Sequence, residues 1–226
     1  MREIVIDTET TGLNFRSGDR IIEVGCVELI NHVSTSNTLQ FYCKTDKEIS
    51  ESAKKISGIS NEFLKDKKTF EENHQEFLSF IKNDVLIIHN SDFDMGFLNN
   101  ELSIIGKPPL KNKVVDTVSL ARKVLNTRIA NLDYLCRRFN IDLSERKLHG
   151  ALLDSRLLAE VYLELRGGKQ FSMDLNQKES KKDSNKKNKL NSPSKTTKFE
   201  PTHEDIRLHK ETIKDIKDAF WNKNPY

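Results

Sequence analysis

The 226-residue sequence has little cysteine and no long apolar run, and both shortages limit what the protein can be. Its three cysteines, Cys26, Cys43 and Cys136, lie far apart and form no C-x-x-C pair. This spacing favours buried thiols in a reducing compartment over disulfides or zinc ligands. No stretch approaches the roughly 20 apolar residues of a transmembrane helix, and residues 1–7 read directly into a strand without signal-peptide features. We therefore expect a cytoplasmic protein without a membrane association.

An excess of positive over negative charge is also small, and it is confined to one segment. The net charge is +3, from 37 Lys and Arg against 34 Asp and Glu, and the mean hydropathy is -0.62. Residues 176–200 contain eight lysines and three acids, a local charge of +5, which leaves −2 for the rest of the chain. A run rich in Lys, Asn and Ser is typical of a solvated linker, with weak attraction to phosphate as a side effect.

Hydrophobic periodicity predicts strands first and then alternating helices and strands. The first three strands are expected at 2–7, 20–30 and 38–44, antiparallel, with 31–37 as a turn region. Short buried strands follow at 84–89 and 114–115. Helical spacing covers five further segments: 70–82, 93–105, 117–125, 131–139 and 151–166. This order indicates an α/β fold in which helices pack on a mixed central sheet.

The chain divides into three parts. Gly167 and Gly168 stop the last core helix, so the first domain is expected at 1–168. A basic, flexible linker is expected at 169–201, and an amphipathic helix within 202–226 that begins with a capping box from Thr202 to Asp205. We interpret that helix as a docking element, because alone it has no core on which to bury its apolar stripe; folding back on the domain is the alternative. The stripe consists of Ile206, Ile213, Ile216, Phe220 and Trp221.

Acidic residues stand where two predicted strands end. Asp7 and Glu9 are two residues apart, so both project from the same face of the first strand. Adjacent like charges raise each other's pKa, and a cation would hold them. Taken alone, the pair is more typical of a polar strand end exposed to water. Asp92 and Asp94 follow the strand at 84–89 in a first helical turn, where capping accounts for Asp92 fully and for Asp94 in part.

The third group is His149 and Asp154 at the start of the last core helix. Asp154 lies among four leucines, which is an unusually apolar setting for a carboxylate. The offset of five residues places the two side chains apart on a continuous helix, so we expect His149 in the preceding loop. A histidine in a loop is normally a surface residue, and its interpretation depends on the other two groups.

Together, the patterns D-x-E, H-N-x-x-F-D and H-x-x-x-x-D resemble those of the DEDD exonuclease superfamily, in its histidine branch. The likeness covers about residues 1–166 and implies a ribonuclease-H-like α/β fold. It implies that two divalent ions, Mg²⁺ or Mn²⁺, are bound by Asp7, Glu9, Asp94 and Asp154, with Asp7 bridging both. It also implies that His149 takes a proton from the attacking water as general base.

The same resemblance implies a binding surface for the terminal nucleotide. Thr10, Thr11, Gly12 and Leu13 would form its floor, with Leu13 as an apolar wedge. Phe93 could stack there, although a core position is at least as consistent with its sequence context. Asp116 also ends a strand, but its counterpart in the superfamily is structural, so we leave it out of the site.

Further stretches resemble the proofreading subunits of bacterial replicative polymerases, among them residues 8–13, 58–64 and 148–154. The segment 170–175 resembles a sliding-clamp peptide through Gln170, Met173 and Leu175, with a merely extended segment as the alternative. The implied partners are frayed or single-stranded 3′ ends of DNA, the clamp, and the polymerase catalytic subunit, which the terminal helix would bind. An RNA-trimming 3′→5′ exonuclease and an inactive adaptor are the competing hypotheses.

Overall fold

A five-stranded mixed sheet forms the centre of the first part of the chain. The computed structural model describes residues 1–167 and 202–213. The strands are β1 (Arg2–Thr10), β2 (Ile21–Ile30), β3 (Val33–Tyr42), β4 (Val85–Ile88) and β5 (Val114–Asp116), in the order β3-β2-β1-β4-β5. β1 pairs with β2 antiparallel and with β4 parallel, and β5 continues the parallel half. β1 is therefore central, and the sheet is mixed as expected.

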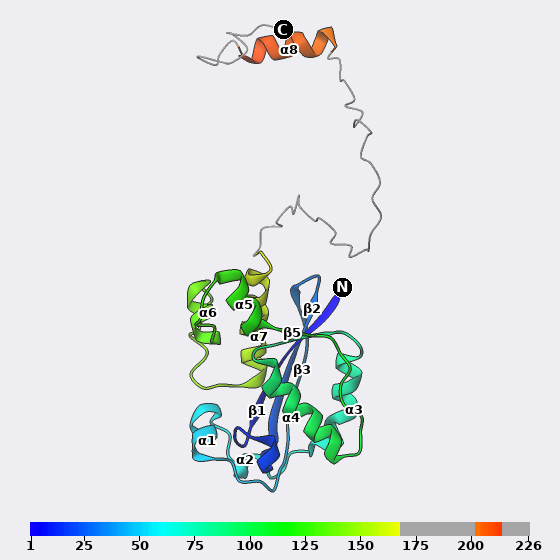
Figure 1. Cartoon of the computed structure of the whole chain (residues 1–226), viewed down its shortest axis with the longest axis vertical. Helices are drawn as coiled ribbons and strands as arrows, with labels where there is room; N and C mark the ends of the chain where they lie inside the picture. The colour runs from blue at the N-terminus through cyan, green and yellow to red at the C-terminus, as the bar shows by residue number, and fades with distance from the viewer. Residues whose placement is uncertain (168–201, 214–226) are drawn as a thin grey trace, which may run out of the picture. The chain divides into compact units, whose positions relative to one another are not determined.

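Helices cover both faces of this sheet (Figure 1). Alternation along β1 separates two cores: Ile4 and Ile6 face one side, and Val5 faces the other. The first core is closed by α3 (Phe70–Ile81) and α4 (Ser91–Ile104). The second is closed by α5 (Thr117–Leu125), α6 (Leu132–Arg138) and α7 (Ala151–Leu165). This three-layer arrangement is the ribonuclease-H-like fold that the sequence predicts.

Two short helices and a 3-10 turn complete the domain and were not expected from the sequence. These are η1 (Phe15–Ser17), α1 (Glu51–Ser57) and α2 (Asn61–Leu64). Ser50 and Ser60 cap α1 and α2 by accepting backbone N–H bonds. Such short helices owe their stability to packing, because their length is too small for propensity to decide.

The five helices predicted within the first domain lie within two residues of their predicted bounds, and Thr117–Leu125 matches at both ends. The prediction of a turn region at 31–37 was wrong, because β3 begins at Val33. A two-residue turn joins β2 and β3, in which Asn31 and His32 have φ of 52° and 69°. Positive φ at both positions gives the twist that a tight hairpin needs.

The described part of the tail is α8 (His203–Ile213). Thr202 and Asp205 form the predicted reciprocal cap, since the Asp205 N–H donates to the threonine hydroxyl and the Thr202 N–H donates to the Asp205 carboxylate. Ile206 is half-buried. Of the other residues predicted to bind partners, the Ile213 side chain and Gln170, Met173, Leu175, Ile216, Phe220 and Trp221 lie outside what the structure describes.

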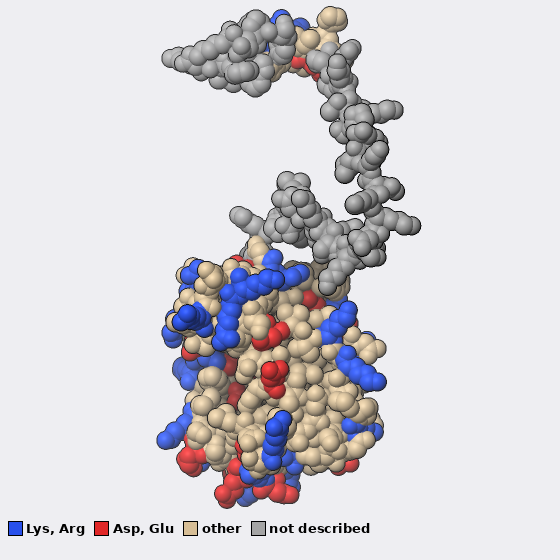
Figure 2. Space-filling view, viewed as in Figure 1, with Lys and Arg blue, Asp and Glu red and all other residues tan. Residues whose placement is uncertain are grey.

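Surface charge on the first domain is divided between the two signs. On the face shown in Figure 2, Lys and Arg side chains gather at the upper left of the domain, whereas Asp and Glu lie near the middle of the face and at its lower end. This agrees with the near-neutral charge expected for this part of the chain. Within residues 1–167 and 202–213, no helix has both the length and the apolar character needed to cross a bilayer.

Candidate active site

The centre of the site is the carboxyl end of β1. Asp7 and Glu9 are on the same face of this strand and keep part of their surface exposed. Between them, Thr8 points to the other face and donates a hydrogen bond of 2.7 Å to Asp94 Oδ1 from α4. The side chain of Asp94 is buried at 3% exposure, whereas Asp92, two residues earlier, is exposed. The structure thus brings Asp94 toward the strand and leaves Asp92 outside the site.

α7 reaches the site because its first turn is held tightly against β2. A Cβ at Gly25 would lie 2.2 Å from the carbonyl carbon of Ala151, so only glycine allows this approach. Ser155 donates to the carbonyl of Gly25 at 2.9 Å. Glu23 accepts from the backbone N–H of Ala151 at 3.2 Å and replaces the cap that Gly150 cannot provide. This docking places Asp154, also at 3% exposure, beside the end of β1.

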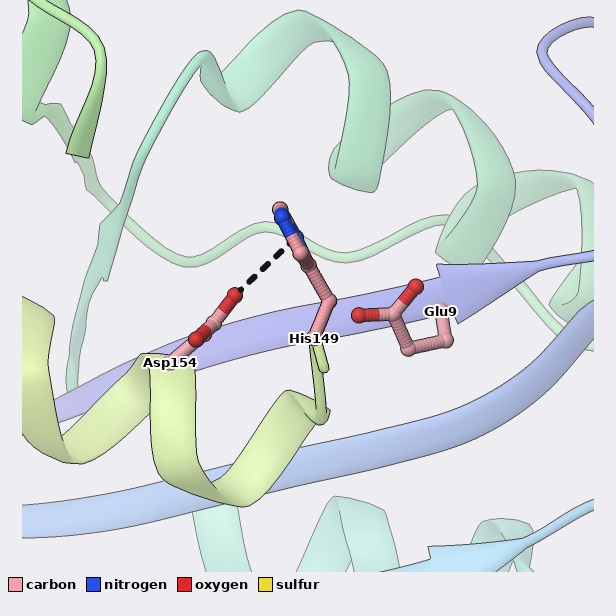
Figure 3. A group of neighbouring side chains, drawn as sticks. All are labelled: Glu9, His149 and Asp154. Carbon is pink, nitrogen blue, oxygen red and sulfur yellow. Dashed lines mark ion pairs between the residues drawn. The ribbon is translucent and has the colours of Figure 1, made fainter. Parts of the chain in front are cut away.

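His149 lies in the loop before α7, as predicted, and its backbone N–H donates to the carbonyl of Ile56 at 3.0 Å. Its Nδ1 is 3.4 Å from Asp154 Oδ2. Figure 3 shows Glu9 on the strand, Asp154 on the first turn of the helix and His149 between them. One ligand atom from each of these three side chains lies within 4.8 Å of the others.

Among the residues that the structure describes, Arg146 is the only arginine or lysine that forms an ion pair with one of the four predicted metal-binding acids. Its Nε and Nη2 donate to the two oxygens of Asp154 at 2.6 and 2.7 Å. Nη1 donates to Asp133 at the start of α6, and Nη2 lies 3.1 Å from His149 Nδ1. Because a guanidinium can only donate, Nδ1 accepts in this arrangement.

The carboxylates show the electrostatic cost of their proximity. Burial, then repulsion from Asp94 and Glu9, raises the pKa of Asp7 well above its usual range. Burial and the charges of Glu23 and Asp154 raise the pKa of Glu9 to about 8. The pKa of Asp94 is raised by burial, and hydrogen bonds from Thr8 oppose the increase. Clustered oxygen donors whose charged forms repel each other fit a hard divalent cation, because its charge removes that repulsion.

The pKa values of the two histidines in the site are lowered, whereas those of the carboxylates are raised. Burial, followed by the positive charge of Arg146, lowers the pKa of His149. A second histidine, His89, directly follows β4. Its Nδ1 forms a hydrogen bond of 2.8 Å with the hydroxyl group of Thr117. Burial lowers the pKa of His89 as well. Both rings are therefore biased toward the neutral form, and a neutral imidazole can accept a proton.

A cavity of about 410 Å³ opens beside these groups. It includes three predicted residues and continues over the start of α6. The residues around it are Asp7, His89, Asn131, Leu132, Asp133, Arg137, Arg146, His149 and Asp154. The space is sufficient for a nucleotide-sized group, and Asp7, His149 and Asp154 line it.

The residues predicted to contact the terminal nucleotide follow β1 directly. Leu13 is 84% exposed and projects from the loop, as a wedge requires. Thr11 is fully buried, and its hydroxyl bonds to Asp19 and to the N–H of Arg20, so it supports the loop. Thr10 donates to the carbonyl of Gly12 at 2.6 Å. The contact of these residues with a nucleotide stays a prediction.

Phe93 and Asp116 show two different outcomes. Phe93 is half-buried and packs 4.8 Å from the ring of Phe97, at the border of the first core. Asp116 caps α5 by accepting from the N–H groups of Val118 and Ser119, which agrees with its expected structural role.

Sequence reasoning missed Glu23, Arg146 and Asp133. Glu23 carried a signal, since it is the single charged residue between Ile21 and Val27 in a buried strand. Arg146 and Asp133 carried none, because a charged residue in a polar loop or a first helical turn is ordinary.

Known proteins are similar to this chain along nearly its whole length. A model of the RNase_T exonuclease family matches residues 4–162. A protein of Rickettsia felis named DNA polymerase III subunit epsilon is 42% identical over 222 residues, which is 96% of this chain and 97% of that protein. The protein of the same name in Escherichia coli is 46% identical over 180 residues, covering 76% of this chain and 74% of its own length.

Solved structures give the same fold at lower identity. The nuclease domain of 3′hExo, described as a DEDDh family member bound to rAMP, has a TM-score of 0.65 at 19% identity, over 74% of this chain and 92% of that one. Exonuclease X in complex with 5′ overhanging duplex DNA has a TM-score of 0.59 at 22% identity, over 73% and 91%.

Proposed function

The chain belongs to the family of DNA polymerase III epsilon subunits and carries an exonuclease domain, and from this membership we propose that it removes mismatched 3′-terminal nucleotides during replication. The observation that carries the proposal is the convergence of Asp7, Glu9, Asp94 and Asp154 from β1, α4 and α7, with His149 beside them. Acids that repel one another in a buried setting are costly, and a function accounts for their presence.

We propose that Asp7, Glu9, Asp94 and Asp154 hold two divalent cations, Mg²⁺ or Mn²⁺. Such cations, when bound, supply positive charge to the attacking and departing oxygens of a phosphodiester. Besides burial, the charges of Asp94, Glu9 and Asp154 raise the pKa of Asp7, so the four carboxylates lie close to one another. Asp94 is oriented by Thr8, which fixes the carboxylate relative to the strand.

His149 is the proposed general base. It accepts a proton from the water that attacks the phosphorus, the bond from phosphorus to the 3′ oxygen breaks, and a nucleoside 5′-monophosphate is released. For Nε2 to accept, Nδ1 has to carry the ring proton and donate it. Asp154 Oδ2, at 3.4 Å, is the acceptor within reach.

We infer the substrate and the partners with support from the same membership. Leu13, Thr10–Gly12 and Phe93 contact the terminal nucleotide of a single-stranded or frayed DNA end. The terminal helix binds the polymerase catalytic subunit, and residues 170–175 bind the sliding clamp. This assembly places the protein with the replication machinery in the cytoplasm. Tethering raises the local concentration of the nuclease at the primer end, so modest intrinsic affinity is sufficient.

Nucleotide release from 5′-labelled single-stranded DNA and from RNA of the same sequence tests the proposal. We expect stepwise 3′ shortening, faster on DNA, with Mg²⁺ or Mn²⁺ and none with chelator. Asp94→Asn abolishes the activity, whereas Asp92→Asn, an exposed acid of the same helix turn, keeps it. Faster cleavage of RNA would instead identify a trimming enzyme, and no metal-dependent shortening would leave the adaptor hypothesis.

Removal of residues 202–226 tests the docking role of the tail. The shortened chain keeps its nuclease rate and loses its association with the polymerase catalytic subunit in gel filtration. A loss of nuclease activity would mean that the terminal helix belongs to the catalytic domain.

A further inference from the structure

One guanidinium connects the catalytic groups to the rim of the cavity. Arg146 donates to both oxygens of Asp154, to Asp133 and, at 3.1 Å, toward His149 Nδ1. Its side chain is only 8% exposed although it comes from a loop, whereas the side chain of Asp133 is 43% exposed. The arginine is therefore shared between one buried carboxylate and one that faces solvent.

The backbone around Arg146 allows this shared position. Its N–H donates to the carbonyl of Leu143 at 2.9 Å, and the loop then continues to His149, whose N–H is bound to Ile56. The long side chain crosses from this loop to the first turns of α6 and α7. A planar fork on a carboxylate has a defined geometry, and an arginine with two carboxylates in reach has two such arrangements.

The contact with Asp154 conflicts with the proposed metal site. Asp154 is one of the four acids assigned to the cations, and both of its oxygens already accept from Arg146. A cation bound to either oxygen meets the positive charge of the guanidinium at close range. Arginine is not deprotonated in proteins, so a loss of its charge cannot remove the conflict.

We propose that Arg146 is a positioning residue that moves from Asp154 to Asp133 when the cation binds. It holds Asp154 and His149 in place before binding, and Asp133 keeps the guanidinium at the rim of the cavity afterwards. This inference rests on the proposed metal-dependent function. Asp133 already accepts from Nη1, so the movement breaks the bonds to Asp154 and keeps one existing contact.

The movement also changes which nitrogen of His149 can accept a proton. While Nη2 donates to Nδ1, the neutral ring carries its proton on Nε2. Once the guanidinium leaves, Nδ1 can donate to Asp154 Oδ2, and Nε2 becomes the acceptor. Cation binding and preparation of the base are thereby linked through one side chain.

Titration calorimetry with Mn²⁺ alone tests the inference on the full chain after treatment with chelator. Arg146→Gln removes the competing charge, and we expect about tenfold tighter Mn²⁺ binding. Asp133→Asn removes the carboxylate to which the guanidinium moves, and we expect Mn²⁺ binding to be about threefold weaker. In the Arg146→Gln background, Asp133→Asn should change the affinity less than about twofold, because Asp133 acts through Arg146.

Arg146→Lys serves as the second variant, since it keeps the charge and lacks the fork. It should bind Mn²⁺ with an affinity between those of the wild-type chain and Arg146→Gln, and circular dichroism verifies the fold of each variant. Weaker or unchanged Mn²⁺ binding in Arg146→Gln overturns the proposal and leaves a purely structural contact. An equal effect of Asp133→Asn in both backgrounds overturns it too. If the wild-type chain binds no Mn²⁺, the proposed function itself has failed.

Discussion

Glu9→Gln should make the domain more stable at pH 8 in the presence of chelator, although it removes a catalytic acid. The pKa of Glu9 rises from 4.5 in an unfolded chain to about 8 in the folded one. The folded state therefore binds more protons between these values, and the free energy of unfolding falls as the pH rises through this window. At 1.36 kcal/mol for each pKa unit, the shift lowers the free energy of unfolding at pH 8 by about 4 kcal/mol. Because neighbouring acids titrate together with Glu9, the part that the variant recovers is roughly 2–4 kcal/mol.

The assay is urea unfolding of wild-type chain and variant at pH 5 and pH 8, with chelator. At pH 5 the same relation gives a difference in unfolding free energy of less than about 1 kcal/mol between variant and wild type, so the two unfolding curves should nearly coincide there. Added Mn²⁺ should stabilise the wild-type chain at pH 8 and the variant much less, since the variant lacks a ligand. An equal stabilisation at both pH values, or a loss of stability at pH 8, would refute the reasoning that repulsion and burial at Glu9 oppose folding.

Three other substitutions probe the base, the wedge and the docking of α7. His149→Gln should lower the nuclease rate by about 10²- to 10⁴-fold while calorimetry still detects Mn²⁺ binding; loss of binding would make His149 a ligand instead. Leu13→Ala should raise KM for single-stranded DNA and change stability by less than about 0.5 kcal/mol, because its side chain is 84% exposed. Gly25→Ala should cost about 3 kcal/mol or more in thermal unfolding, since its Cβ would lie 2.2 Å from Ala151; Gly150→Ala, with no atom within 4 Å, is the matched control.

The electrostatics of the site also explain why β2 and β3 belong to its support. Glu23 stands directly opposite Glu9 in the antiparallel pair of β1 and β2. Like charges in that position are unfavourable, and burial raises the pKa of Glu23. Gln40 from β3 donates to it at 2.7 Å, and the N–H of Ala151 donates from α7. The sheet thus stabilises the carboxylate of Glu23, and Glu23 in turn orients α7, the helix that carries Asp154.

Most helices could be predicted because their periodicity and their end signals agree. Phe70–Ile81 has a full capping box at Thr69 and Glu72, and Thr117–Leu125 begins at the cap of Asp116. β3 was predicted to begin too late because residues 34–37 near its start are all polar and lie on an edge strand, so they show no apolar alternation. Pairing with β2, and not local preference, extends it to Val33.

By itself the sequence determined the order of the strands and of the longer helices, the three groups of acids and the loop position of His149, because each depends on local spacing and on chain direction. Tertiary structure alone decided that Glu23 caps α7 and that Arg146 joins Asp154 to Asp133. These contacts connect residues up to 128 positions apart, through a glycine that admits a helix and a loop that turns inward. No periodicity records such contacts, since they arise only when separate elements pack and a buried charge must find its partner.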